Sequence, residues 1–247
     1  MASFNIGLSL MSSNPQKGRH NRELFRAEWR RILSLMTGRS LNDNDIALEE
    51  KGRPYFPGGK EDFNVSHSGA LTAVSLVSGE KLRAGCDVEL VKPRAGTIKI
   101  ANELFTAQER DYVIAAEKSR SAFYEIWTLK ECYLKLKGLT VFEMKHTPSF
   151  ISEKNGDFHF SLSTATNAVA DTPLSFYLYE LKGASGEWYI LAAAIEGTEQ
   201  LHPEISWYSQ STLSSQSTLL SQSTLHARSI AEINAARSPA ETVSPNS

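Results

Sequence analysis

The sequence has little of what several protein classes require. Only two of its 247 residues are cysteines, Cys86 and Cys132, so it cannot carry a disulfide scaffold, and neither belongs to a metal-ligand pair. It lacks a positive excess, with 26 Lys and Arg against 28 Asp and Glu, which argues against sequence-blind nucleic-acid binding. It also lacks the roughly 18 unbroken apolar residues of a membrane span and the pattern of a secretory signal. We therefore expect a soluble, reduced, cytoplasmic monomer without membrane or nucleic-acid partners.

The last part of the chain lacks aromatic residues altogether. None follows Tyr208, and the pentapeptide SQSTL occurs three times, starting at Ser209, Ser215 and Ser221. Too little apolar surface is available there to offset the entropy of ordering the chain. The composition predicts a disordered, low-complexity tail over 209–247.

Upstream of the tail, helical and strand patterns alternate. Apolar spacing and terminal glycines predict helices at Arg19–Gly38 and Ser119–Gly138, and a capping-box pattern predicts another at Phe105–Ala116. Strands are expected at Leu71–Ser78 and Leu82–Val91, with Glu50–Phe63 as a loop. Three further segments, FHFSLSTA, LSFYLYEL and EWYILAAAI, predict antiparallel strands joined by short turns. The sequence thus predicts an α+β fold in two halves, 1–92 and 93–208.

Two carboxylates stand out on one predicted strand. Asp87 and Glu89 lie two residues apart, so they project to the same face at roughly 6–7 Å, given a rise of ~3.3 Å per residue. Like charges at this distance repel unless a cation lies between them, and Mg²⁺ is held by carboxylates together with substrate phosphates. Taken alone, the pair is more typical of a solvated strand face.

The helix at 119–138 carries a second set of functional side chains. Trp127, Glu131 and Lys135 follow one another at intervals of four residues and share a face. Such a Glu–Lys pair is common on exposed helices. Here, however, the surrounding apolar residues indicate a largely buried helix, in which the two charges need partners such as a metal and a phosphate.

Polar residues before the Leu71–Ser78 strand form a third group. Ser66 and His67, within Asn64–Gly69, offer a hydroxyl, an imidazole and backbone N–H groups to an anion. Arg53, between Gly52 and Pro54, is a loop cation suited to a phosphate. Each alone is more typical of an ordinary loop. Together, the three groups supply what Mg²⁺-assisted phosphoryl transfer needs, without identifying the nucleophile or the leaving group.

The order of these motifs resembles the 4′-phosphopantetheinyl transferases of the surfactin-synthetase (Sfp) type. The matching blocks are KGRPYF, FNVSHSG, GCDVELVKPR, LFTAQE and FYEIWTLKECYLKLKG. The resemblance implies two similar α+β halves related by a pseudo-twofold axis, with coenzyme A bound between them. It also implies Mg²⁺-dependent transfer of the phosphopantetheine arm of coenzyme A to a serine of an apo acyl or peptidyl carrier protein, with release of 3′,5′-ADP.

The resemblance further implies roles for individual residues. Glu109 would be the general base for the carrier serine, although it could instead complete a capping box with Thr106. Lys135 would bind the pyrophosphate and favour departure of the nucleotide, while the role of Lys130 stays open. The Mg²⁺ ligands would be Asp87, Glu89 and Glu131. The 3′-phosphate end of coenzyme A would be held by Arg22, Arg53, Ser66 and His67.

The chain departs from the family pattern in one place. Only SSNPQKG separates the first predicted strand, ASFNIGLSL, from the helix at Arg19–Gly38, so an early basic helix is missing and weaker coenzyme A binding is expected. This departure keeps a second hypothesis open, a shortened relative that binds carrier proteins without transferring the arm. A Mg²⁺-dependent nuclease is a third hypothesis, which the near-neutral charge disfavours.

Overall fold

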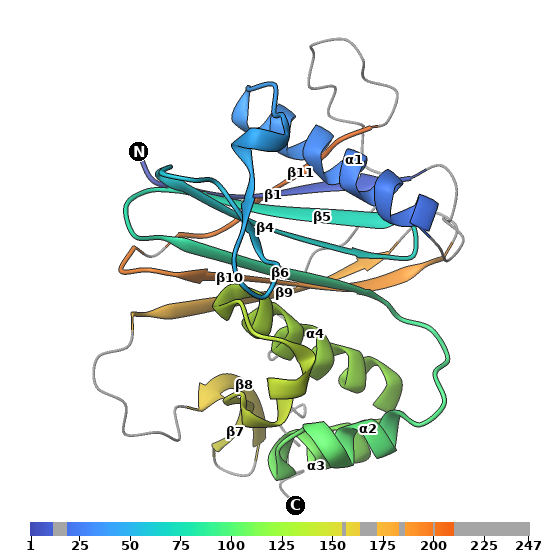
Figure 1. The fold of residues 1–247 in the computed structure, drawn as a ribbon. Helices are drawn as coiled ribbons and strands as arrows, with labels where there is room; N and C mark the ends of the chain where they lie inside the picture. The colour runs from blue at the N-terminus through green and yellow to red at the C-terminus, as the bar shows by residue number, and fades with distance from the viewer. Residues whose placement is uncertain (12–18, 155–156, 164–171, 183–185, 200, 210–247) are drawn as a thin grey trace, which may run out of the picture.

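A computed structural model describes residues 1–11, 19–154, 157–163, 172–182, 186–199 and 201–209 (Figure 1). The predicted tail therefore lies outside the described residues apart from Ser209, and so do residues 12–18, the short connection before the first helix. None of the described helices is long and apolar enough to cross a lipid bilayer.

Two β-sheets form the centre of the fold. The first has the strand order β11 (Glu204–Trp207), β1 (Ser3–Leu10), β5 (Leu71–Ser78) and β4 (Glu61–Ser68). In this sheet β1 runs parallel to β11 and antiparallel to β5. The second sheet has the antiparallel order β6 (Arg83–Leu90), β10 (Trp188–Glu196) and β9 (Leu174–Lys182). Each sheet is thus assembled from segments far apart in the sequence.

One long helix covers the outer face of each sheet, giving four layers (Figure 1). Helix α1 (Arg19–Thr37) packs on the first sheet through Trp29, Ile32 and Leu33. Helix α4 (Ser119–Lys137) packs on the second sheet, where its apolar side chains share a core with Ile190 and Ala192 of β10. A third core fills the space between the two sheets. Because strand side chains alternate between faces, each sheet contributes to two of these cores.

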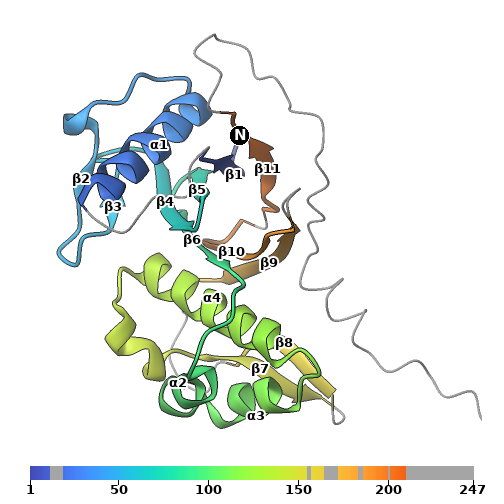
Figure 2. The ribbon, with the colours of Figure 1, turned by 90° about the vertical axis from the view of Figure 1, so that its right-hand side faces the viewer.

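The two sheets meet at the edge formed by β4 and β6, which lie side by side (Figure 2). Instead of a backbone ladder, alternate side chains of β4 accept backbone N–H groups of β6. We call this row of bonds the β4–β6 seam. It pairs Asp62 with Ala84 N, Asn64 with Cys86 N, Ser66 with Val88 N, and Ser68 with Leu90 N, at 2.8, 3.3, 3.2 and 3.0 Å. The seam fixes the register of β6 against the first sheet.

The remaining elements are short and flank the two long helices. Helices α2 (Thr97–Leu104) and α3 (Ala107–Ala115) precede α4, and a two-stranded sheet of β7 (Ser149–Lys154) and β8 (Asp157–Ser163) follows it. A small hairpin of β2 (Ala47–Leu48) and β3 (Pro54–Tyr55) precedes β4. Short 3₁₀ helices occupy Asp43–Asp45 and Val141–His146.

The predicted α+β class and the three predicted helices are confirmed, with α1, α3 and α4 close to their expected bounds. Helix α4 ends at Gly138, whose φ of 67° is readily available to glycine, and Lys135 and Lys137 in its last turn complement the helix dipole. The division at residue 92 is not followed by the sheets, because β6 joins β9 and β10, and β11 returns to β1. The pseudo-twofold relation between the halves stays a prediction.

Two local expectations were wrong. The segment FHFSLSTA does not join the strands that follow it; its residues 158–163 form most of β8, which pairs with β7, while β9 and β10 pair with each other. The polar residues of 64–68 lie within strand β4 rather than in a turn before a strand. Their short polar side chains fit a strand because the β4–β6 seam uses them as hydrogen-bond acceptors.

Candidate active site

The candidate site lies where α4 crosses β6. A single glycine allows this contact, because a Cβ atom at Gly85 would lie 2.8 Å from Leu136 Cβ and 2.9 Å from the Cys132 carbonyl oxygen. Asp87 and Glu89 follow Gly85 at intervals of two, so they project from β6 on the same side, toward the helix. The shared face predicted for the two carboxylates is confirmed by the contacts that both make with α4.

Helix α4 places three side chains over these carboxylates. Lys135 Nζ lies 2.6 Å from Asp87 Oδ1, and the indole N–H of Trp127 donates to Glu89 Oε1 at 3.2 Å. Glu131 lies between them on the same helical face and interacts electrostatically with Asp87 and Glu89. The four-residue spacing of the helix thus matches the two-residue spacing of the strand, and the shared helical face predicted for Trp127, Glu131 and Lys135 is confirmed.

Two serines of the β4–β6 seam contact the carboxylates from the other side. Ser66 Oγ donates to Asp87 Oδ1 at 2.8 Å, and Ser68 Oγ donates to Glu89 Oε2 at 2.9 Å. Lys135 Nζ also donates to Ser66 Oγ at 2.8 Å. The site is therefore formed by β4, β6 and α4 together, and none of these elements could form it alone.

The carboxylates are held in an unfavourable electrostatic state. Burial and the neighbouring Asp87 raise the pKa of Glu89 above its usual value, and the same two causes raise the pKa of Glu131 to about 7. Although burial opposes its charge, Lys135 has a raised pKa because Asp87 stabilises the ammonium. One lysine thus faces three acids, and additional positive charge would be favourable here.

The donor set fits a hard divalent cation. In their present side-chain orientations, no three Asp, Glu, His or Cys residues in the described part of the chain converge closely enough to hold a metal ion, so the carboxylates would have to turn to bind one. At this site the cation touching Asp87 is Lys135. The other oxygen of Asp87, Oδ2, is buried and has no hydrogen-bond partner among the described residues. A buried carboxylate oxygen without a partner is costly unless a cation meets it, which supports Asp87, Glu89 and Glu131 as ligands.

His67 lies on the opposite face of β4 from Ser66, because the two are neighbours on a strand. Its exposed imidazole stacks on Phe25 of α1, with ring centroids 3.8 Å apart. Although His67 is exposed overall, Phe25 covers one face of its ring, and this local desolvation together with the charge of Lys135 lowers the pKa of His67. Arg22, exposed on α1 three residues before Phe25, lies on the same side of that helix. The structure therefore groups His67 with α1 and Ser66 with the carboxylates.

Comparison with known proteins now decides the family. Residues 83–188 match the model of the 4′-phosphopantetheinyl transferase superfamily, and this range contains Asp87, Glu89, Glu131 and Lys135. The chain is 31% identical over 137 residues to a 4′-phosphopantetheinyl transferase, AcpT, of Salmonella typhi, which covers 54% of this chain and 70% of the relative. It is also 29% identical over 112 residues to the 4′-phosphopantetheinyl transferase Sfp of Bacillus subtilis (strain 168), covering 44% of this chain and 48% of that one.

The chain belongs to the 4′-phosphopantetheinyl transferase superfamily. The resemblance inferred from the motifs is thereby confirmed, and the chain is a transferase. The contacts of Glu109, Arg53 and Ser66 differ from those that the roles predicted for them would need.

Glu109 does not reach the site in this transferase. Its side chain is fully buried, and Oε2 lies 3.0 Å from Lys130 Nζ and accepts from Thr106 N at 2.8 Å. Its other oxygen accepts the backbone N–H of Phe150 at 3.0 Å. The capping box predicted as the alternative for Glu109 is present. A carboxylate committed to these partners and closed off from solvent is not a base for an incoming serine.

Lys130 is the buried counterpart of Glu109. Its ammonium donates to Thr147 Oγ1 at 2.7 Å in addition to its pairing with Glu109. Burial lowers the pKa of Lys130, and the carboxylate opposes this shift. The pair joins α3, α4 and the segment before β7, and these contacts support a structural role for Lys130.

Arg53 is likewise committed to the protein. Its guanidinium forms a bidentate pair with Asp62 at 3.0 and 2.5 Å and donates to the carbonyl oxygens of Ala84 and Lys135 at 2.8 and 3.1 Å. Only 6% of Arg53 is exposed. The fifth N–H of the guanidinium donates to the carbonyl oxygen of Pro54 at 3.4 Å, so every donor of Arg53 has a partner within the protein. Arg53 therefore joins the first bond of the β4–β6 seam to the C-terminal end of α4.

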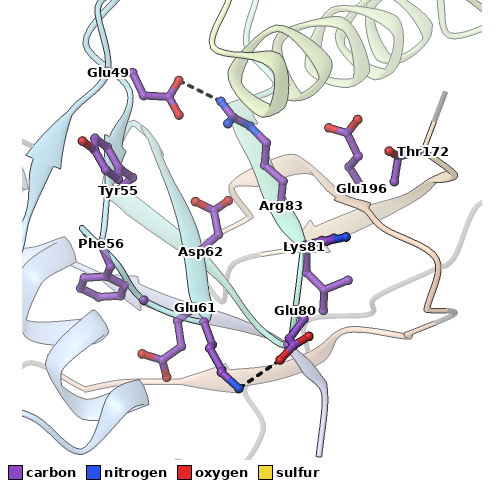
Figure 3. A pocket seen from close by; sticks show the side chains of 14 residues that line it. Glu49, Tyr55, Phe56, Glu61, Asp62, Glu80, Lys81, Arg83, Thr172 and Glu196 are labelled. Atoms are coloured by element: carbon purple, nitrogen blue, oxygen red, sulfur yellow. Dashed lines mark hydrogen bonds and ion pairs between the residues drawn. The ribbon is translucent and has the colours of Figure 1, made fainter.

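A hollow of about 660 Å³ lies at the other end of β4 and β6 (Figure 3). Its cations are largely neutralised by acids, as in the Arg83–Glu49 and Lys60–Glu80 pairs at 2.8 and 3.1 Å. Carboxylates outnumber cations in its lining, at Glu49, Glu61, Asp62, Glu80 and Glu196 against Lys60, Lys81 and Arg83. Such a surface repels phosphates, so this hollow is not where the transferase would hold a phosphorylated substrate.

Ser68 and Gly85 are the residues of this region that sequence reasoning missed. Ser68 lies in the motif FNVSHSG, two residues after Ser66, and Gly85 lies in GCDVELVKPR, two residues before Asp87. Without knowledge that β4 lies beside β6, however, this two-residue spacing could not be assigned a partner.

Proposed function

We propose that this transferase moves the 4′-phosphopantetheine arm of coenzyme A to a serine of an apo acyl or peptidyl carrier protein, with Mg²⁺, and releases 3′,5′-ADP. The observation that carries the proposal is the convergence of Asp87, Glu89, Glu131 and Lys135 at the crossing of β6 and α4. The membership of the chain in the 4′-phosphopantetheinyl transferase superfamily supports the same reaction.

Asp87, Glu89 and Glu131 would hold Mg²⁺, with Asp87 Oδ2 as the buried oxygen that lacks any other partner among the described residues. When bound, the ion supplies Lewis-acid stabilisation of the charge on the pyrophosphate. It also relieves the repulsion that raises the pKa values of Glu89 and Glu131.

Lys135 would stabilise the leaving nucleotide. Its side chain is 30% exposed, and its pKa is raised, so it is a charged group that can turn from Asp87 toward a pyrophosphate oxygen. In the reaction, a P–O bond forms to the serine and the P–O bond to the nucleotide breaks, which leaves negative charge on the departing oxygen. A cation beside that oxygen addresses the largest electrostatic demand of the step.

Glu131 replaces Glu109 as the proposed proton acceptor. The serine hydroxyl must lose its proton as it attacks, and a carboxylate within reach of the reacting groups can accept it. Glu131 also lies on the half-buried face of α4 next to the other reacting groups, whereas Glu109 is fully enclosed.

His67, Phe25 and Arg22 would bind the nucleotide end of coenzyme A. The stacked His67 and Phe25 rings offer an aromatic surface, and Arg22 supplies a charge for the 3′-phosphate. Ser66 and Arg53, which the sequence placed with this group, serve instead within the protein.

The direct test is intact-mass spectrometry of an apo carrier protein incubated with the full chain, coenzyme A and Mg²⁺. The wild type should add one phosphopantetheine, and Asp87→Asn and Glu131→Gln should abolish the gain. The matched control is Asp111→Asn, an exposed carboxylate on α3 paired with Arg110, which should leave transfer unchanged.

The alternatives give different results in this assay. No mass gain with several carriers, from a folded wild type that still binds them, would refute the transfer and favour a docking module. Loss of activity in Asp111→Asn comparable with that in Asp87→Asn would refute the assignment of the site. A nuclease is not favoured by any contact described here.

A further inference from the structure

Ser66 and Ser68 each accept a hydrogen bond from a backbone N–H and donate one to a carboxylate, and Ser66 accepts a further one from Lys135 Nζ at 2.8 Å. Ser66 Oγ accepts the backbone N–H of Val88 at 3.2 Å and donates to Asp87 Oδ1 at 2.8 Å. Ser68 Oγ accepts the N–H of Leu90 at 3.0 Å and donates to Glu89 Oε2 at 2.9 Å. A hydroxyl has one proton and two lone pairs, so accepting the N–H leaves the proton for the carboxylate.

The type of side chain along the β4–β6 seam changes at the positions of β4 that lie beside Asp87 and Glu89 of β6. The first two positions are filled by Asp62 and Asn64, which accept from β6 through a carbonyl or carboxylate oxygen. The last two positions are serines, which both accept and donate. Holding β6 requires only an acceptor, so the added donors at Ser66 and Ser68 serve the two carboxylates.

We propose that Ser66 and Ser68 are positioning residues that fix the orientations of the Asp87 and Glu89 carboxylates for a divalent cation. The inference rests on the proposed metal site. Ser66 and Lys135 both bond to Oδ1 of Asp87, which turns Oδ2 away as the free oxygen. Ser68 and Trp127 hold one oxygen each of Glu89, so that its carboxylate plane is fixed from both sides.

The energetic reason is preorganisation. A free carboxylate samples several rotamers, and binding a metal must restrict them, whereas these two are restricted before the metal arrives. Loss of such a hydrogen-bond partner typically weakens metal binding by about 10–100-fold. The serines themselves contact neither the metal nor the substrate in this scheme.

The test is calorimetric titration of the full chain with Mn²⁺ alone. Ser66→Ala and Ser68→Ala should each raise the Kd by about 10–100-fold relative to the wild type. Ser68→Thr keeps the hydroxyl and should restore most of the affinity. Ser68 is only half-buried, so its variants keep the test valid if Ser66→Ala fails to fold.

Two controls separate positioning from general destabilisation. Asn64→Ala removes a bond of the same seam without touching Asp87 or Glu89, so it should lower the melting temperature and leave the Mn²⁺ Kd unchanged. Ser9→Ala removes a buried serine that donates to Glu28, far along the chain from the site, and should also leave the Kd unchanged.

The outcomes are distinguishable from failure of the proposed function. If the wild type binds Mn²⁺ and the serine variants bind it equally well, the positioning role is refuted while the metal site stands. If Asn64→Ala weakens binding as much as Ser66→Ala, the effect belongs to the seam in general and the inference is again refuted. If the wild type binds no Mn²⁺, the metal site falls and the inference with it.

Discussion

The buried pair of Glu109 and Lys130 gives the sharpest prediction. Both side chains are fully buried, and the carboxylate lies 3.0 Å from the ammonium. Replacing Glu109 with glutamine keeps the shape of the side chain but leaves the Lys130 charge without a counter-ion. Breaking a buried pair from one side costs about 3–5 kcal/mol of unfolding free energy.

This cost translates into a measurable melting shift. For a chain of this size, each 1 kcal/mol shifts the melting temperature by roughly 2–4 °C, so Glu109→Gln should melt roughly 6–20 °C below the wild type. The exposed pair of Arg110 and Asp111 is the neighbouring control, and Asp111→Ala should cost less than about 1 kcal/mol.

A second substitution separates structure from catalysis. Replacing Lys130 with methionine in the Glu109→Gln variant removes the stranded charge and should recover most of the lost stability, because apolar residues often replace a buried pair at little cost. Carrier modification should recover in parallel when it is measured below the melting temperature. A Glu109→Gln variant with wild-type unfolding free energy but no transfer would refute this reasoning and restore Glu109 as a base.

Three further predictions follow from single residues. Burial raises the pKa of Glu125 to about 8, so the stability that its protonated form contributes is fully present below its unfolded pKa and is lost as the pH rises through 8. Glu125→Gln should remove this dependence of the melting temperature on pH. If the melting temperatures of the two proteins change in parallel from pH 5 to 9, the assignment is contradicted. Gly85→Ala should cost about 1–3 kcal/mol because its Cβ meets Leu136 and displaces α4, while Gly59→Ala, with no contact nearer than 3.4 Å, is the chemical-denaturation control. Mg²⁺ should raise the melting temperature more at pH 8 than at pH 6, because Glu131 titrates near 7 and metal ligands must be deprotonated; an equal shift at both pH values would show that Glu131 is not a ligand.

The local part of the site was predictable because it depends only on backbone periodicity. Two residues along a strand return a side chain to the same face, and four along a helix do nearly the same. Asp87 and Glu89, and likewise Glu131 and Lys135, could therefore be grouped from their spacing. The end of α4 at Gly138 and the capping box at Thr106 followed from equally local rules.

The contacts of Glu109 and Arg53 that the sequence did not predict all depend on a partner from elsewhere in the chain. Glu109 matched both a catalytic and a capping pattern, and only the packing of α3 against α4 brings Lys130 to it. Arg53 looked like a free loop cation until Asp62 and the end of α4 were seen to occupy its guanidinium. Helix α2 and strand β11 were missed because they are short and carry weak patterns, with Ala101 as the one buried residue of α2.

The sequence by itself determined which faces the helices and strands have and which chemical groups each face carries, because those follow from bond geometry within a few residues. Only the tertiary structure decided which faces meet. It separated His67 from Ser66 by the alternation of β4, and it placed β6 at the edge where serines contact both metal-ligand candidates. It also enclosed Glu109 away from the site. These outcomes arise from packing between segments far apart in the chain, which no local pattern encodes.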